Sequence, residues 1–247
     1  MTDLPQSDAL ELEQDAGWLT VWFNQPEIRN PLTSERVKAL LALCDAIRDD
    51  RTIRGVTFRG RGGVFCAGGD LKSFKNAFQG AMDRDDVVAM SLEAGALFQA
   101  VNTLPQLTVM AIEGAAIAGG LGLTCTGDVV VAERGAKFAF TETTIGLSPA
   151  QISPFVLQRV GARNGRRLML LAQTLTGEDA VAVGLVDQLV DGTAGMDKAL
   201  AGIRKQLERC APGAVADTKA LLLDIPSLSR QQQQKQAAEN FADRMVS

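Results

Sequence analysis

Short apolar runs and longer stretches with helical spacing alternate along this chain. Residues 9–13 and 18–23 each alternate apolar and polar positions on either side of a short turn, which predicts a β-hairpin. Apolar residues between positions 37 and 47 recur every three or four residues after Thr33, so we expect an amphipathic helix capped by that threonine. The β-branched run at residues 55–59 predicts the next strand.

The rest of the chain continues this alternation. We expect helices at residues 87–101, 119–126, 155–160, 164–172 and 178–184, and strands at residues 107–113, 129–132, 137–140 and 185–190. After a change of composition near Thr193, three helices follow, separated at Pro212 and Pro226. This order predicts an α/β fold with a strand-rich core at residues 1–192 and a helical region at residues 193–247. The repeated strand–strand–helix order also favours a spiral of similar ββα units.

Two glycine-containing segments stand out because each lies between a predicted strand and a predicted helix. Residues 64–70 read Val-Phe-Cys-Ala-Gly-Gly-Asp, and residues 114–123 read Gly-Ala-Ala-Ile-Ala-Gly-Gly-Leu-Gly-Leu. A glycine pair lets the backbone approach a ligand closely, and the first N–H groups of a helix lack intrahelical partners. We call these two strand-to-helix turns the first corner (residues 64–70) and the second corner (residues 114–123). Each can direct one N–H at a single oxygen, as in an oxyanion hole. Either pair alone is also explained as an ordinary turn, but two pairs in matching settings favour a site.

Composition and charge narrow the class of protein. The net charge of the 247 residues is −4 with no long basic run, so the electrostatic pattern of a nucleic-acid-binding protein is missing. The apolar runs are too short to span a membrane, and the first residues do not resemble a signal peptide. Four widely spaced cysteines, Cys44, Cys66, Cys125 and Cys210, lack metal-ligand spacing and are expected to be buried thiols in a cytoplasmic protein.

The absence of histidine and tyrosine restricts any catalytic chemistry. It excludes Ser-His-Asp and Cys-His catalysis and histidine-bound zinc, so proton transfer falls to a carboxylate, a lysine or a cysteine. Glu142 is the main candidate base, because a carboxylate buried beside aromatic strand residues has a raised pKa and can both accept and donate a proton. A solvated glutamate at a strand end is the alternative. We expect Glu113, directly before Gly114, to be a structural acceptor for loop N–H groups.

Other candidate side chains have ordinary structural explanations. Asp70 is well placed to cap the next helix, and a role as a catalytic acid is the alternative. Lys72 and Arg29 can meet a phosphate or can be solvated surface cations. Ser148 misses the nucleophile-elbow pattern and has no histidine to activate it, so we exclude it as a nucleophile.

Taken together, the motifs resemble the crotonase superfamily, the enoyl-CoA hydratase/isomerase family. The resemblance covers nearly the whole chain and is carried by residues 24–32, 65–72, 114–128 and 137–142. It implies a spiral of ββα units whose C-terminal helices pack subunits into trimers, often paired into hexamers. It also implies an enoyl-CoA or other acyl-CoA thioester as substrate, so that coenzyme A enters with the substrate and no separate cofactor, metal, nucleic acid or membrane is needed.

The resemblance also implies roles for individual residues. The N–H groups of Gly69 and Gly119 would hold the thioester oxygen, and Glu142 would be the acid/base. Residues around the two corners and in the first loop would bind the substrate and its CoA portion: Arg29, Ala67, Gly68, Asp70, Leu71, Lys72 and Gly120.

The sequence departs from the usual hydratase pattern at Gly122, where such enzymes carry the first of two glutamates. A single carboxylate suits an isomerase, which moves one proton between two carbons. Residues 142–156, however, are similar to hydratases of methylglutaconyl-CoA and isohexenylglutaconyl-CoA, a group that tolerates glycine here. We therefore expect an enoyl-CoA hydratase. An enoyl-CoA isomerase is the close alternative, and a crotonase-fold protein that binds acyl-CoA without turnover is the alternative of another class.

Overall fold

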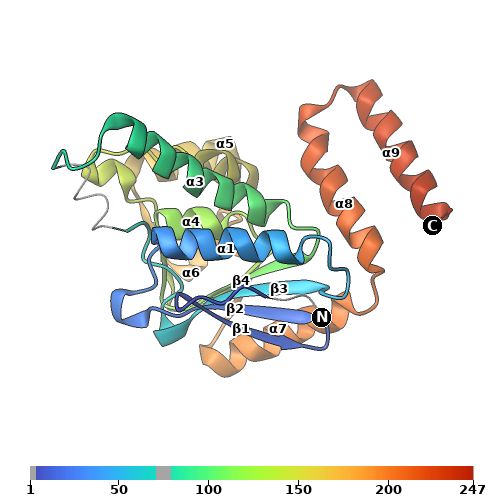
Figure 1. Ribbon diagram of the computed structural model, residues 1–247, viewed down its shortest axis with the longest axis horizontal. Coiled ribbons are helices and arrows are strands. Elements are labelled where there is room, and N and C mark those ends of the chain that lie inside the picture. Colours follow the sequence, from blue (N-terminus) through green and yellow to red (C-terminus); the bar gives the residue numbers. More distant parts are fainter. Residues whose placement is uncertain (1–3, 71–78, 247) are drawn as a thin grey trace.

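The larger of two sheets contains six strands. The computed structural model describes residues 4–70 and 79–246, and its elements are shown in Figure 1. The strands of the larger sheet lie in the order β1 (Leu10–Asp15), β2 (Trp18–Phe23), β3 (Gly55–Gly60), β4 (Leu107–Ile112), β6 (Val129–Glu133) and β9 (Gln188–Val190). β1 and β2 form the predicted antiparallel hairpin, and every other neighbouring pair is parallel.

The smaller sheet includes a short strand within the second glycine-containing segment, where no strand was predicted. Its strands are β5 (Ala115–Ile117), β7 (Lys137–Ala139) and β8 (Thr174–Leu175). β5 and β7 are parallel, with Ile117 opposite Ala139, and β7 and β8 are antiparallel. The sequence prediction missed β5 and β8 because a strand of two or three residues carries no clear alternation.

Helices follow the strands in the predicted order. They are α1 (Ser34–Ile47), α3 (Arg84–Asn102), α4 (Gly119–Thr124), α5 (Ser153–Leu171), α6 (Gly177–Ala182), α7 (Gly192–Leu207), α8 (Pro212–Asp224) and α9 (Arg230–Met245), with short 3₁₀ turns η1 (Pro26–Ile28), η2 (Arg61–Gly63), η3 (Glu142–Ile145) and η4 (Ile225–Ser227). The side chain of Thr33 accepts from the Arg36 N–H, which confirms the predicted cap. α3 begins three residues earlier than expected because Asp83 caps it.

Two hydrophobic clusters lie on opposite faces of the larger sheet. Successive side chains of a strand point to opposite faces, and on β4 Met110 and Ile112 belong to one cluster while Val109 and Ala111 belong to the other. α1, α3, α4 and α5 cover the first face, and α7 covers the second (Figure 1). With helices on both faces of a largely parallel sheet, the predicted α/β class is confirmed.

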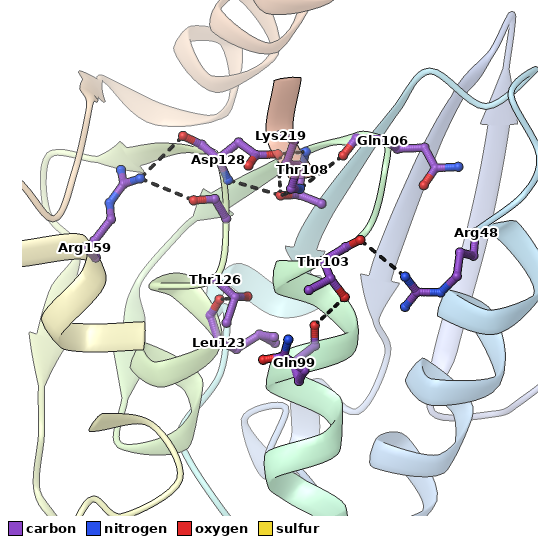
Figure 2. A network of polar contacts seen from close by, with 11 residues as sticks. Arg48, Gln99, Thr103, Gln106, Thr108, Leu123, Thr126, Asp128, Arg159 and Lys219 are labelled. Carbon is purple, nitrogen blue, oxygen red and sulfur yellow. Dashed lines mark hydrogen bonds and ion pairs between the residues drawn. The ribbon is translucent and has the colours of Figure 1, made fainter. Parts of the chain in front are cut away.

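α8 and α9 extend away from the sheets as an antiparallel pair (Figure 1). The three predicted C-terminal helices are thus confirmed, and the expected boundary at residue 192 falls on the first residue of α7. Lys219 of α8 ties this pair to the core, because its Nζ lies 2.7 Å from Asp128 Oδ2 and 3.4 Å from Thr108 Oγ1 (Figure 2). Burial lowers the pKa of Lys219, and the Asp128 carboxylate opposes that shift.

Candidate functional site

The two glycine-containing segments lie side by side in the structure. The Phe65 N–H donates to the Glu113 carbonyl at 2.9 Å, and the Cys66 N–H donates to the Ala115 carbonyl at 3.0 Å. The Cys66 carbonyl in turn accepts from the Ile117 N–H at 3.0 Å, so Cys66 pairs with Ala116 as in a parallel ladder. Segments 64–70 and 114–120 therefore run in the same direction and turn away from the sheets at the same edge.

Two glycines allow this close approach. Gly68 has φ of 104°, and a Cβ there would lie 3.1 Å from the Ile117 carbonyl oxygen. A Cβ on Gly120 would lie 2.7 Å from the Cβ and the carbonyl oxygen of Cys66. Since ordinary Cβ contacts begin near 3.4 Å, a side chain at either position would force the segments apart.

The amides of Gly69 and Gly119 meet where the segments turn. The position of a Cβ on Gly119 lies 3.8 Å from the Gly69 nitrogen. Within residues 4–70 and 79–246, neither N–H donates a backbone hydrogen bond to the protein. Two neighbouring donors without backbone acceptors in the described part of the chain are available to bind one oxygen that carries negative charge, as an oxyanion hole does.

Ala118, directly before Gly119, has a strained backbone. Its φ of 47° and ψ of −119° lie in a region that L-residues rarely adopt. The conformation is held on both sides, because the Ala118 N–H donates to the Ala139 carbonyl at 2.8 Å and the Ala118 carbonyl accepts from the Gly122 N–H at 2.9 Å. The Gly119 amide is therefore aimed by a backbone that two hydrogen bonds fix.

The loop after β2 supports the first corner. The Arg29 carbonyl accepts from the Ala67 N–H at 3.0 Å, and the Leu32 N–H donates to the Gly68 carbonyl at 2.8 Å. A Cβ on Gly119 would lie 3.3 Å from Leu32 Cδ1. Leu32 thus contacts both corners, through its backbone on one side and its side chain on the other.

Two fully buried polar residues hold this loop in place. Asn30 Nδ2 donates to the carbonyls of Arg61 and Val64 at 2.9 and 2.7 Å. The Arg36 guanidinium donates to the carbonyls of Ala9 and Pro31, and burial lowers its pKa to about 10. These bonds satisfy polar groups that would otherwise be buried without partners.

Glu142 is the first residue of η3 rather than the last of a strand. Its Oε2 is buried and has no hydrogen-bond partner among the described residues. Burial raises the pKa of the Glu142 carboxyl, because desolvation disfavours the charged form. A carboxyl group in this state can take a proton from a bound reactant and return it.

The topology brings Glu142 to the edge where the two amides lie. β5 and β7 are parallel and in register at Ile117 and Ala139. Gly119 is two residues beyond the first of these, and Glu142 is three residues beyond the second. Both therefore leave the smaller sheet at the carboxyl ends of adjacent parallel strands, the usual place for a ligand site in α/β proteins.

Other predicted site residues have varied surroundings. Arg29, beside the first corner, is exposed to solvent, and its backbone has a positive φ of 65°. Ala67 and Asp70 are partly buried in that corner. Leu71 and Lys72 lie outside the described residues, as does the helix that Asp70 was expected to cap.

Two sequence expectations need correction, the first of them only in part. Glu113 is buried, and its backbone carbonyl accepts from the Phe65 and Ala115 N–H groups, as expected of a structural acceptor. Its carboxylate instead accepts from the Arg59 guanidinium at 2.8 and 2.9 Å. Arg59 also pairs with Asp197 of α7, so the Glu113 side chain belongs to an ion-pair network. Cys210 is exposed, whereas Cys44, Cys66 and Cys125 are buried free thiols as expected.

Sequence reasoning missed Leu32 and Arg36 as supports of the site. Arg36 carried a signal, because it stands four residues before Leu40 on the apolar face of α1. Leu32 carried no signal beyond its place at the end of the motif at residues 24–32, because it acts through contacts with segments distant in sequence.

Comparisons with known proteins agree over most of the chain. The family model described as enoyl-CoA hydratase/isomerase matches residues 13–246. The structure of Pseudomonas aeruginosa AtuE is 38% identical, with a TM-score of 0.93 over 97% of this chain and 92% of that chain. An enoyl-CoA hydratase/isomerase from Marinobacter aquaeolei is 34% identical, with a TM-score of 0.93 over 98% and 92%. Human mitochondrial methylglutaconyl-CoA hydratase is 30% identical over 194 residues, which are 76% of this chain and 56% of that protein.

Proposed function

The chain belongs to the enoyl-CoA hydratase/isomerase family, the crotonase superfamily, and from that premise we propose that it adds water across the 2,3 double bond of an enoyl-CoA thioester. In this proposal the N–H groups of Gly69 and Gly119 bind the thioester oxygen, and Glu142 is the single protein acid/base. The expected crotonase-like α/β fold is confirmed by the superposition over nearly the whole chain.

In the proposed reaction Glu142 first accepts a proton and then donates it. Glu142 takes a proton from water as the water oxygen forms a bond to the β-carbon. The electron pair of the double bond moves toward the thioester, and the two N–H groups stabilise the resulting enolate oxygen. The proton held by Glu142 then passes to the α-carbon. The product has gained one hydrogen and one hydroxyl group, and the carboxylate is restored.

One observation carries this proposal: Glu142 is partly buried, and its buried Oε2 has no hydrogen-bond partner among the described residues, at the edge where the Gly69 and Gly119 amides also have no backbone acceptor among them. A buried carboxylate oxygen without a hydrogen bond destabilises the folded protein, so a structural role does not explain this Oε2. A raised pKa lies nearer to neutral pH, at which the carboxyl group then accepts and donates a proton with similar ease.

An enoyl-CoA isomerase is the second candidate, and the same residues support it. One carboxylate is sufficient to remove a proton from one carbon and return it to another. The non-catalytic alternative, binding of acyl-CoA without turnover, gives no role to the buried Glu142 Oε2, which has no partner among the described residues.

The acyl group and the CoA portion are part of the same proposal. The likeness to human methylglutaconyl-CoA hydratase supports a branched glutaconyl-CoA as one substrate to test. We propose that Arg29 and Lys72 meet the CoA phosphates, that Ala67, Gly68, Asp70, Leu71 and Gly120 border the thioester, and that no separate cofactor is needed. No helix in the described part of the chain is long and apolar enough to cross a membrane. Assembly into trimers or hexamers through residues 193–247 and a cytoplasmic location remain predictions.

Turnover in heavy water separates the candidates. A hydratase removes the conjugated enoyl-thioester absorbance of a 2-enoyl-CoA and leaves one deuterium on the α-carbon of the product. An isomerase instead creates that absorbance from a 3-enoyl-CoA. A protein that only binds acyl-CoA does neither, and that result with 2-enoyl and 3-enoyl substrates of several chain types would overturn the proposal.

A further inference from the structure

Gly122 of α4 faces the side chain of Ile152. A Cβ on Gly122 would lie 2.1 Å from Ile152 Cγ2 and 2.6 Å from Ile152 Cβ, which is far inside van der Waals contact. Ile152 is 4% exposed, so its side chain is packed into this place rather than turned to solvent. The volume that a side chain at position 122 would need is therefore already filled.

The filled volume lies on the same face of α4 as Gly119. Residues three apart on a helix share a face, and Gly119, which carries one of the two amides, is three residues before Gly122. A Cβ on Gly119 would point at the Gly69 nitrogen and Leu32, so this face is directed at the first corner. One turn further along the same face, Ile152 makes the surface apolar.

The segment that carries Glu142 ends in this contact. Ile152 is the residue directly before α5, ten residues after Glu142. The preceding residue, Gln151, fills the space beside Gly95 of α3, with its Oε1 2.3 Å from where a Cβ would stand. Gln151 Nε2 also donates to Ser91 Oγ of the same helix at 3.1 Å. The consecutive side chains of Gln151 and Ile152 thus fill the spaces beside Gly95 and Gly122, and these contacts fix the end of the segment that carries Glu142.

We infer that Ile152 is a specificity-determining residue that keeps the active site to a single carboxylate by occupying the place of a side chain at position 122. The inference rests on the proposed function, because it concerns which acid/base groups can reach the substrate. Gly122 and Ile152 form one unit: an acidic side chain at position 122 requires that Ile152 be removed as far as its Cβ.

The packing part of this inference is tested by thermal unfolding of Gly122→Ala, Ile152→Gly and the double variant. Alanine at residue 152 would not suffice, because its Cβ alone would stand 2.6 Å from a Cβ at position 122. In the wild-type background Gly122→Ala should lower Tm by about 2–12 °C. In the Ile152→Gly background it should cost nothing. An equal loss in both backgrounds would overturn the inference.

The catalytic part is tested with the double variants Gly122→Glu/Ile152→Gly and Gly122→Gln/Ile152→Gly, which differ only in an acidic group. With crotonyl-CoA, which brings no carboxylate of its own, the glutamate variant should hydrate at least about tenfold faster than the glutamine variant. Its pH profile of kcat/KM should also show one more ionisation. Identical rates and profiles would overturn the inference. A wild-type protein without turnover on any enoyl-CoA would overturn the proposed function instead, because the Tm comparison does not depend on turnover.

Discussion

Gly120→Ala tests whether the contact between the two corners positions the oxyanion donors. The new Cβ would stand 2.7 Å from Cys66, about 0.7 Å short of ordinary contact at 3.4 Å. Both neighbours are backbone or directly attached to it, so the segments must separate. A misplacement of this size at a reacting group costs about 10²-fold in rate, and overpacking costs about 1–3 kcal/mol of stability.

Steady-state kinetics and thermal unfolding of the same preparation measure both effects. We expect kcat to fall about 10²-fold with a smaller change in KM, because the donors act on charge that develops in the transition state. Tm should fall by about 2–12 °C. Gly202→Ala is the matched control, since Gly202 lies inside α7 with open space around its Cβ position. It should leave kcat unchanged and raise Tm slightly.

The reasoning is refuted by a Gly120→Ala protein that is folded, has a lower Tm and retains kcat within about threefold of wild type. That result would mean that the corners can separate without moving the two amides. The Gly202→Ala control guards against a general effect of adding a methyl group to a glycine.

Three further substitutions have expected outcomes. Glu142→Gln should raise Tm at neutral pH. Burial raises the folded-state pKa of Glu142, so wild type is most stable below the ordinary glutamate pKa and loses stability as the pH rises through the folded-state pKa. The higher Tm of the variant should therefore disappear in acid. Lys219→Met should cost about 1–3 kcal/mol, or about 2–12 °C in Tm, since among the described residues it leaves the Asp128 carboxylate bonded only to Thr108. It should not change kcat, because Thr108 stands at the start of β4, the end of the strand opposite to the one that leads to the second corner. Ala118→Gly should raise Tm by a few degrees, because relief of about 1–3 kcal/mol of strain exceeds the added unfolded-state entropy of about 0.4–1 kcal/mol.

Local patterns were sufficient for the elements with strong periodicity. The β1–β2 hairpin and α1 were predictable because alternation and the Thr33 cap are encoded within a few residues. The break between the two predicted helices at residues 155–172 is present as a kink at Gly161, with φ of 74° inside α5. The pairing of β5 with β7 was not predictable, because Ala115–Ile117 is ordered by a neighbour more than twenty residues away.

The candidate site divides in the same way. The positions of Gly69, Gly119 and Glu142 could be chosen from motifs and strand ends. The filling of the space beside Gly122 could not, because the side chain that fills it comes from Ile152, thirty residues further along the chain. The partner of Glu113 was mistaken for the same reason, since Arg59 reaches it across the sheet.

The most direct test of the central claim compares wild type with Glu142→Gln in the loss of enoyl-thioester absorbance. The substrates are crotonyl-CoA, a long-chain 2-enoyl-CoA and 3-methylglutaconyl-CoA, and circular dichroism confirms that both proteins are folded. The account predicts turnover of at least one substrate by wild type and a loss of about 10²–10⁴-fold in the variant. A folded Glu142→Gln protein that hydrates the same substrate at a rate close to wild type would contradict it.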